Sequence, residues 1–213
     1  DRTMARGLFL TFEGCDGCGK TTVLNRVSVL LREKGIPFLL TREPGGSKIA
    51  EEIRNVILDK KNTEMDPRCE ALLYAASRRQ HLVEIVLPAL EKGIHVLSDR
   101  YLDSSLAYQG YARGIGMEEV YSINLFAIDG MLPDLTFFLD LPPEEGLARI
   151  RKNETREVNR LDLEKENFHK KVYEGYKILL ENYPERIVRI DAKKTVEEES
   201  QEIFDILAKR ITR

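Results

Sequence analysis

The stretch that decides the fold is Gly14-Cys15-Asp16-Gly17-Cys18-Gly19-Lys20-Thr21. It matches the pattern G-x-x-x-x-G-K-[ST] of a phosphate-binding P-loop at every position. The apolar segment Leu8–Phe12 precedes it, and a segment with apolar residues at helical spacing begins near Lys20. In a strand, glycine-rich turn and helix of this kind, successive backbone N–H groups surround an anion, and the helix N-terminus adds partial positive charge. The sequence therefore predicts a site for the phosphates of a nucleotide.

The side chains of this loop suit different tasks. Lys20 is expected to reach the β- and γ-phosphates, and Thr21 to offer its hydroxyl to Mg²⁺. A redox or zinc motif is the alternative for Cys15 and Cys18, but both already belong to the phosphate loop and no second pair of ligands follows. The residues expected to bind ATP are Gly14, Cys15, Asp16, Gly17, Cys18, Gly19, Lys20, Thr21 and Thr22.

Four further short apolar segments alternate with segments of helical spacing along the chain. Strands as apolar as these are buried on both faces, which is typical of parallel sheets covered by helices. We therefore predict a three-layer α/β fold of the P-loop NTPase kind, with a central parallel sheet of about five strands. Besides Leu8–Phe12, the strands are expected at Phe38–Thr41, His95–Ser98, Thr136–Leu139 and Ile187–Ile190.

Two of the intervening helices can be bounded. Apolar residues recur at helical spacing from Leu72 to Val86, and Pro88 and Gly93 mark the expected end of that helix. Another helix follows Leu163 and is expected to end before Tyr183-Pro184.

Composition sets the class of protein and excludes several partners. The 213 residues are predicted to form one domain, and the three residues before Met4 are read as an artificial extension. Lysine and arginine (33) nearly balance aspartate and glutamate (36), so we expect no general attraction for a nucleic acid or an anionic membrane. No apolar run approaches the roughly 20 residues that span a bilayer, and no secretory signal is found. With its three cysteines reduced, the protein is expected to be cytoplasmic.

Charged residues follow two of the predicted strands, at the edge where α/β sheets bind ligands. Arg42, within Thr41-Arg42-Glu43-Pro44-Gly45-Gly46, is placed to clamp a second phosphate, although the same residues also suit a plain exposed turn. Asp99 stands where a Walker-B acid helps to hold Mg²⁺, and a simple ion pair with Arg100 is the alternative. The candidate metal ligands are therefore Thr21 and Asp99, partly through water.

Five motifs spread over most of the chain occur in the order of one family. They are Phe12-Glu13-Gly14 leading into the P-loop, Thr41 to Gly46, Leu73-Tyr74-Ala75-Ala76-Ser77-Arg78, Asp99-Arg100-Tyr101, and Ser104-Ser105-Leu106-Ala107-Tyr108-Gln109-Gly110. In these motifs the sequence resembles the thymidylate kinases of the bacterial type. The resemblance implies phosphorylation of dTMP to dTDP with ATP-Mg as the donor, in the synthesis of dTTP, by a homodimer.

The resemblance also implies roles beyond the P-loop. Tyr74, which the sequence alone would place in the core, matches an aromatic residue that stacks on thymine, and Arg78, on the same helix face, matches an arginine that donates to O4. Ser105 and Gln109 resemble the groups that meet the pyrimidine edge, and Tyr108 resembles the tyrosine that crowds the sugar 2′ position. The arginines that hold the monophosphate correspond to Arg42, Arg54 and Arg100. The whole implied substrate-binding set is Asp16, Arg42, Glu43, Arg54, Tyr74, Arg78, Arg100, Ser105, Tyr108 and Gln109.

A polar segment with four arginines, from Arg149 to Arg160, is predicted to be a mobile lid. In the family the catalytic arginine lies either in the P-loop or in the lid, and this P-loop contains none. The lid should therefore supply it, while Arg156 is expected to face solvent. The residues expected to be catalytic are Lys20, Arg100, Arg149, Arg151 and Arg160.

Two alternatives remain open. The acceptor could be another pyrimidine monophosphate, or the chain could be a nucleotide-binding switch without catalysis. A guanine-reading Asn-Lys-x-Asp is absent, which weighs against a GTPase.

Overall fold

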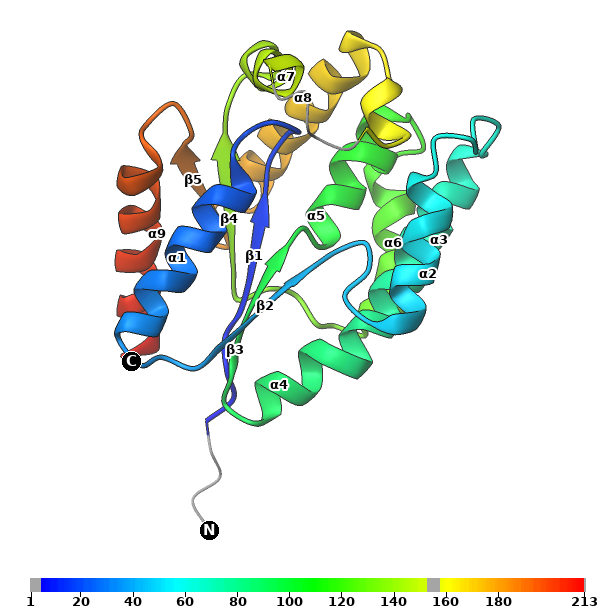
Figure 1. Cartoon of the computed structure of the whole chain (residues 1–213). Helices are drawn as coiled ribbons and strands as arrows, with labels where there is room; N and C mark the ends of the chain where they lie inside the picture. The colour runs from blue at the N-terminus through cyan, green and yellow to red at the C-terminus, as the bar shows by residue number, and fades with distance from the viewer. Residues whose placement is uncertain (1–4, 153–157, 213) are drawn as a thin grey trace.

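A parallel sheet forms the centre of the computed structural model, which describes residues 5–152 and 158–212 (Figure 1). In the described part of the chain the sheet has five strands in the order β2-β3-β1-β4-β5. The predicted three-layer α/β fold is confirmed, and each strand ends within one residue of its predicted bounds. The strands are β1 (Phe9–Glu13), β2 (Phe38–Arg42), β3 (His95–Asp99), β4 (Leu135–Asp140) and β5 (Ile187–Asp191).

The register of the sheet brings chemistry from different parts of the chain to one edge. All residues of β1 and β4 are buried, as their apolar sequences predict. In the parallel pairing of β1 with β3, Phe12 lies opposite Asp99, and in that of β2 with β3, Arg42 lies opposite Asp99. The P-loop, Arg42 and Asp99 therefore meet at the carboxyl edge of the sheet.

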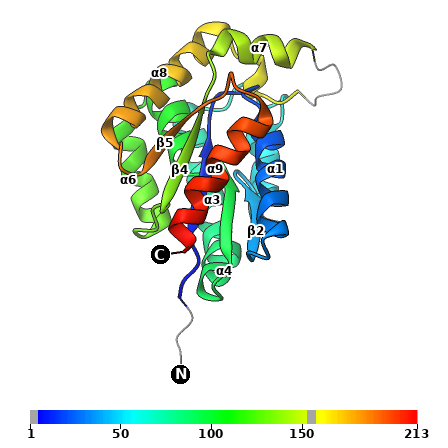
Figure 2. The same cartoon turned by 90° about the vertical axis from the view of Figure 1, so that its left-hand side faces the viewer.

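Helices cover both faces of the sheet, as the two views show (Figures 1 and 2). On one face, α1 (Lys20–Glu33) packs beside α9 (Val196–Ile211), and both bury apolar residues against Phe12 and Phe137. The larger cluster on the other face includes apolar residues of six helices. These are α2 (Lys48–Leu58), α3 (Pro67–His81), α4 (Leu87–Glu91), α5 (Leu102–Ser105), α6 (Met117–Ile128) and α8 (Glu166–Asn182).

The prediction that Pro88 ends a helix is wrong. A π-helical turn, Leu82–Val86, joins α3 to α4, and the N–H of Leu87 bonds to the carbonyl of Leu82, five residues earlier. Pro88 then lies in the first turn of α4, where a helix has no use for its missing N–H. The helical run ends at Glu91, just before Gly93, whose φ of 77° suits a glycine.

The segment predicted to be the lid begins inside a helix. Residues 149–152 belong to α7 (Pro143–Lys152), and Arg160 is buried just before the short 3₁₀ turn Leu161–Leu163. Residues 153–157, and with them Arg156, lie outside the described residues, as do the first three residues and Met4.

A second π-helical segment, Leu106–Ala112, continues α5 and packs against α8 and α6. It carries Tyr108 and Gln109. Within the described residues, no helix is both long and apolar enough to cross a membrane.

Candidate active site

The P-loop surrounds a cavity at the carboxyl edge of the sheet. This cavity, of about 430 Å³, is lined by Cys15 to Thr22 together with Arg149 and Ile150 of α7. Gly17 has a φ of 82°, and a Cβ at this residue would lie 2.2 Å from the carbonyl oxygen of Gly146. Only glycine therefore lets the loop pass this close to α7. All nine residues predicted to bind ATP lie in this loop or in the first turn of α1.

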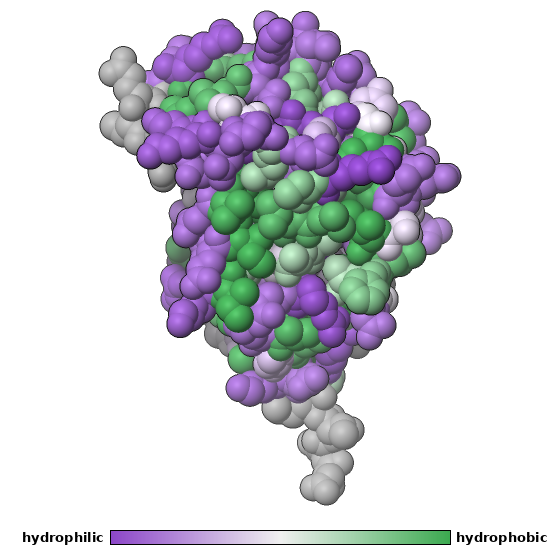
Figure 3. All heavy atoms as spheres, turned by 90° about the vertical axis from the view of Figure 1, so that its right-hand side faces the viewer, coloured by the Kyte–Doolittle hydropathy of each residue, from purple (hydrophilic) through white to green (hydrophobic). Residues whose placement is uncertain are grey.

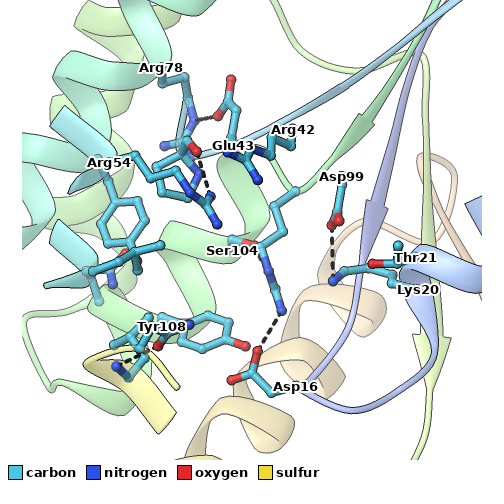
Figure 4. Close-up of a pocket in the computed structure, with 17 residues that line it drawn as sticks. Asp16, Lys20, Thr21, Arg42, Glu43, Arg54, Arg78, Asp99, Ser104 and Tyr108 are labelled. Atoms are coloured by element: carbon cyan, nitrogen blue, oxygen red, sulfur yellow. Dashed lines mark hydrogen bonds and ion pairs between the residues drawn. The ribbon is translucent and has the colours of Figure 1, made fainter. Parts of the chain in front are cut away.

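Lys20 and Asp99 form the charged floor between the loop and β3. The Lys20 Nζ lies 3.1 Å from Asp99 Oδ1 (Figure 4). Burial tends to raise the pKa of Asp99, but Lys20 and Arg100 outweigh it and hold the pKa below its usual range. The carboxylate is therefore ionised at neutral pH.

A magnesium ion would find few protein ligands here. No group of three or more His, Cys, Asp or Glu side chains that could hold a metal occurs in the described residues. An ionised Asp99 and Thr21 nevertheless line a neighbouring cavity together. A few oxygen ligands fit Mg²⁺, which keeps several waters and takes its other ligands from phosphates.

The second cavity, of about 280 Å³, adjoins the first, because Asp16, Lys20 and Thr21 line both. Figure 4 shows its side chains converging from the P-loop, β2, α3 and the segment after β3. Nine of the ten predicted substrate-binding residues line this cavity. They are Asp16, Arg42, Glu43, Arg54, Tyr74, Arg78, Arg100, Tyr108 and Gln109.

Three arginines make part of the second cavity attractive to an anion. Arg100 donates to Ser104 Oγ (3.1 Å) and Tyr176 Oη (3.0 Å), and it also bonds to Asp16 (3.3 Å). Its φ of 74° is unusual for a residue with a side chain, and its guanidinium lies over the ring of Tyr108. The position of Arg100 is thus determined by several partners at once.

Arg42 and Arg54 approach from β2 and α2. Arg42 pairs with Glu51 at 2.9 Å, and Arg54 donates to the carbonyl of Pro44 at 2.8 Å. Burial, together with the nearby Arg42, lowers the pKa of Arg54, so these two cations crowd each other. A dianionic phosphate placed between them would relieve this repulsion.

Arg78 lies deeper, on the far wall of the cavity, with 1% of its surface exposed. Its Nε donates to Glu43 (2.7 Å), and its Nη2 donates to the carbonyl of Tyr101 (3.0 Å). Its Nη1 donates to Ser105 and Asn124. Ser105 therefore lies behind Arg78 and does not line the cavity, unlike the other predicted substrate-binding residues.

Two tyrosines supply the aromatic surface of the cavity. Tyr74 on α3 is only 7% exposed yet lines it. Tyr108 points toward Asp16 in Figure 4, and its buried hydroxyl has no hydrogen-bond partner among the described residues. A buried hydroxyl without a partner is costly, so this group is available to a ligand.

Among the arginines predicted to be catalytic in the lid, the structure brings only Arg149 to the P-loop. A Cβ added at Gly19 would lie 3.6 Å from Arg149 Nη1. Arg151 is exposed on α7. Arg160 instead donates to the carbonyl of Ile57 and pairs with Glu70, away from the loop.

Glu13, at the end of β1, is a residue that the sequence analysis did not assign to the site. Its Oε2 accepts from the backbone N–H groups of Tyr101 and Ser104, and its Oε1 accepts from the hydroxyls of Ser104 and Tyr176. Burial and Asp103 raise its pKa, against the effect of Arg100. The signal in the sequence was an acid directly after an apolar strand, in Phe12-Glu13-Gly14.

Five other residues that line the second cavity were also missed. Two of them, Pro44 and Ser104, stand in the family motifs beside predicted contacts, whereas the other three lie outside those motifs. The five are Pro44, Leu58, Ser104, Asn159 and Leu161.

The family model and the similar proteins found by comparison all carry the same name. The family model described as Thymidylate kinase matches residues 12–203. A protein named thymidylate kinase from Clostridium novyi (strain NT) is 58% identical over 204 residues, which cover 96% of this chain and 100% of that protein. One of the same name from Geobacillus sp. (strain WCH70) is 58% identical over 193 residues, 91% of this chain and 92% of its own. A third, from Halalkalibacterium halodurans, is 54% identical over 209 residues, 98% and 100% of the two chains.

The hydrogen bonds of Glu13 predict different outcomes for two substitutions. Glu13→Gln keeps an oxygen for the two backbone N–H groups, and the hydroxyls of Ser104 and Tyr176 can turn to accept from the new amide. We expect it to lower the free energy of unfolding by less than about 1.5 kcal/mol. Glu13→Ala leaves the two buried N–H groups without an acceptor and removes the ion pair with Arg100, so it should cost about 3 kcal/mol or more. Urea unfolding measures both, and equal losses would contradict the assignment.

Proposed function

The chain belongs to the thymidylate kinase family, and on that premise we propose that it transfers the γ-phosphoryl group of ATP to dTMP, giving dTDP for the synthesis of dTTP. The observation that carries this proposal is the contact between the two cavities at the P-loop. A nucleoside triphosphate in the first cavity and a monophosphate in the second would meet at Lys20 and Asp16, which line both. Phosphoryl transfer depends on holding its two substrates side by side more than on any covalent chemistry.

On the donor side, the backbone of the P-loop and the N-terminus of α1 hold the phosphates of ATP. The ammonium group of Lys20 stabilises the negative charge on the phosphoryl group while it is transferred. Thr21 and Asp99 would hold Mg²⁺, partly through water, which fits the ionised state of Asp99. The ion, when bound, neutralises charge on the phosphates.

On the acceptor side, Arg42, Arg54 and Arg100 hold the phosphate of dTMP. Their guanidinium groups suit the forked hydrogen bonds that a phosphate accepts. Its contact with Asp16 holds Arg100 beside the P-loop. From there its guanidinium can stabilise the negative charge that develops during transfer.

The nucleoside part of dTMP occupies the deeper end of the second cavity. The ring of Tyr74 stacks on thymine, while Arg78 and Gln109 face the polar edge of the base. Tyr108 crowds the sugar 2′ position and so favours deoxyribose. Glu43 and Ser105 act through Arg78, since both accept hydrogen bonds from its guanidinium.

A single assay separates this function from its alternatives. ADP release should require dTMP and should be weaker with dUMP, dCMP or UMP. Lys20→Ala should lower kcat by about 10²-fold or more, because the preorganised cation meets charge in the transition state. A nucleotide-binding switch would consume ATP no faster when dTMP is added. If the kcat of Lys20→Ala stays within about threefold of the parent, the proposed role of Lys20 is contradicted.

The proposed lid, residues 149–160, supplies a cation for the transition state. Arg149 is the first candidate because its Nη1 lies over Gly19, beside the phosphate loop. Arg151 follows on the same helix, α7. Arg160 is the weakest of the three, because its guanidinium is already held by Ile57 and Glu70.

Substitution of the three arginines tests this order. Arg149→Ala should lower kcat by about 10²-fold with little change in the KM for dTMP, because a contact made on lid closure favours the transition state. Arg151→Ala, on the same helix, is the comparison and should lower kcat less than Arg149→Ala does. If all three alanine variants keep kcat within about threefold of the parent, the charge is carried by Arg42 or Arg100.

An apolar face on α3 and α6 supports the homodimer that we propose. Figure 3 shows apolar side chains gathered on this side of the molecule. Phe126 is 91% exposed, and Leu72 and Leu125 are about half exposed. A groove beside them is lined by Ala71, Leu72, Val120 and Ile123, among others. Contiguous apolar surface of this kind marks an interface.

The dimer proposal makes a direct prediction. Phe126→Asp would bury a charge in the interface and should convert the protein to monomers in sedimentation velocity. Leu40→Asp, which alters a partly exposed apolar side chain beside α1, is the control and should leave the dimer intact. A parent protein that sediments as a monomer would refute the proposal.

We place the enzyme in the cytoplasm, with dTMP and ATP as its small-molecule partners. The net charge of −3 supports the absence of nucleic-acid and membrane partners.

A further inference from the structure

Glu70, in the first turn of α3, is a buried carboxylate that the proposed reaction does not use. It is 1% exposed and does not line either cavity. All of its side-chain partners are nevertheless donors. Arg113 donates to both oxygens, with Nε at 3.1 Å from Oε1 and Nη2 at 3.3 Å from Oε2. Arg160 donates to Oε2, and Gln109 Nε2 donates to Oε1 at 3.1 Å.

The two arginines keep this carboxylate ionised. Burial alone would raise the pKa of Glu70, but Arg113 and Arg160 outweigh it and the pKa is lowered. Arg113 is itself held by Glu164 at 2.6 Å and lies over the ring of Phe168. The oxygen that meets Gln109 is therefore fixed in place and can only accept hydrogen bonds.

An acceptor behind Gln109 determines which way its side-chain amide points. An amide has one donor end and one acceptor end, and Glu70 can bind only the donor end. Gln109 lines the second cavity, and its Oε1 accepts no hydrogen bond from any described residue. The carbonyl oxygen is thus the end of the amide left for a ligand.

Thymine and uracil differ from cytosine at N3, the ring atom that this carbonyl oxygen would face. Thymine and uracil carry a hydrogen on N3, which is a donor, whereas N3 of cytosine is an acceptor. A carbonyl oxygen facing N3 accepts from thymine and repels the lone pair of cytosine. An amide free to turn over could offer its NH₂ end to cytosine instead.

We propose that Glu70 is a specificity-determining positioning residue, which selects thymine over cytosine by holding the carboxamide of Gln109 with its oxygen toward N3 of the base. This inference rests on the proposed function, since it assumes that the base of dTMP lies beside Gln109. Glu70 acts without touching the substrate. Specificity here comes from excluding the wrong orientation, which is as effective as adding a contact to the right base.

The same carboxylate also anchors the last residue of the proposed lid, Arg160. Arg160 binds Glu70 through its side chain, and its backbone N–H donates to the carbonyl of Leu58. Its neighbours Asn159 and Leu161 line the second cavity. Glu70 therefore connects two parts of the cavity wall by hydrogen bonds: the side-chain amide of Gln109 and the segment that contains Asn159 and Leu161.

The test compares kcat/KM for dTMP and dCMP. In Glu70→Gln, the residue at 70 can accept or donate, so Gln109 can turn over. The dCMP to dTMP ratio should rise by at least about tenfold, while the KM for ATP stays within about twofold of the parent. Glu70→Asp is the second variant. It keeps the charge that Arg113 and Arg160 require, so it should fold, but it withdraws the carboxylate from Gln109 and should raise the ratio too.

Two further variants separate positioning from general damage. In Glu70→Gln/Gln109→Met the amide is gone, so the gain for dCMP should vanish. Glu164→Gln disturbs the same ion cluster on the far side of Arg113 and should leave the ratio at the parent value.

The outcomes distinguish the inference from the function on which it rests. If the parent does not phosphorylate dTMP, the proposed function itself fails. If the parent is active but folded Glu70→Gln and Glu70→Asp lose dTMP and dCMP activity in parallel, or keep the parent ratio, Glu70 has only a structural role and the inference is overturned.

Discussion

A carboxylate buried away from water must be met by donors, and this constraint shapes the second cavity through three glutamates. Glu13 accepts from the turn after β3 that presents Arg100. Glu43 binds Arg78 and His81 of α3, and Glu70 binds Gln109. Each glutamate fixes a side chain that lines the cavity, namely Arg100, Arg78 or Gln109. The walls of the cavity are therefore organised before any nucleotide arrives, which reduces the entropy lost when the reactants are aligned.

The sequence predicts most of what depends on local patterns. The strands were located to within one residue because buried parallel strands are short apolar runs, and the P-loop because its spacing is specific. Most of the residues that the resemblance implied for the substrate line one cavity, Tyr74 and Gln109 among them. Local signals and family motifs thus account for the fold and for most of the side chains that line this cavity.

What the sequence could not predict depends on contacts between distant segments. Glu13 and Tyr176 are 163 residues apart, and Arg160 and Glu70 are 90 apart, so no local pattern pairs them. Ser105 was predicted to meet the base, yet it lies at the end of α5, outside the cavity, where it accepts a hydrogen bond from Arg78, 27 residues earlier. Pro88 does not end the helix, because the π-helical turn just before it carries the chain into α4, whose first turn accommodates a proline. Irregular helices of this kind have no clear signature in a sequence.

The two cysteines of the P-loop have a practical consequence for work on this protein. Cys15 packs into the apolar cluster on one face of the sheet and Cys18 into the cluster on the other. Burial raises the pKa of both thiols, which leaves them protonated and poorly nucleophilic, whereas Cys69 at the start of α3 is exposed. A maleimide dye added to the native enzyme would therefore attach at Cys69. The protein thus carries a natural attachment point for a fluorescent reporter, next to Glu70, without any cysteine having to be removed.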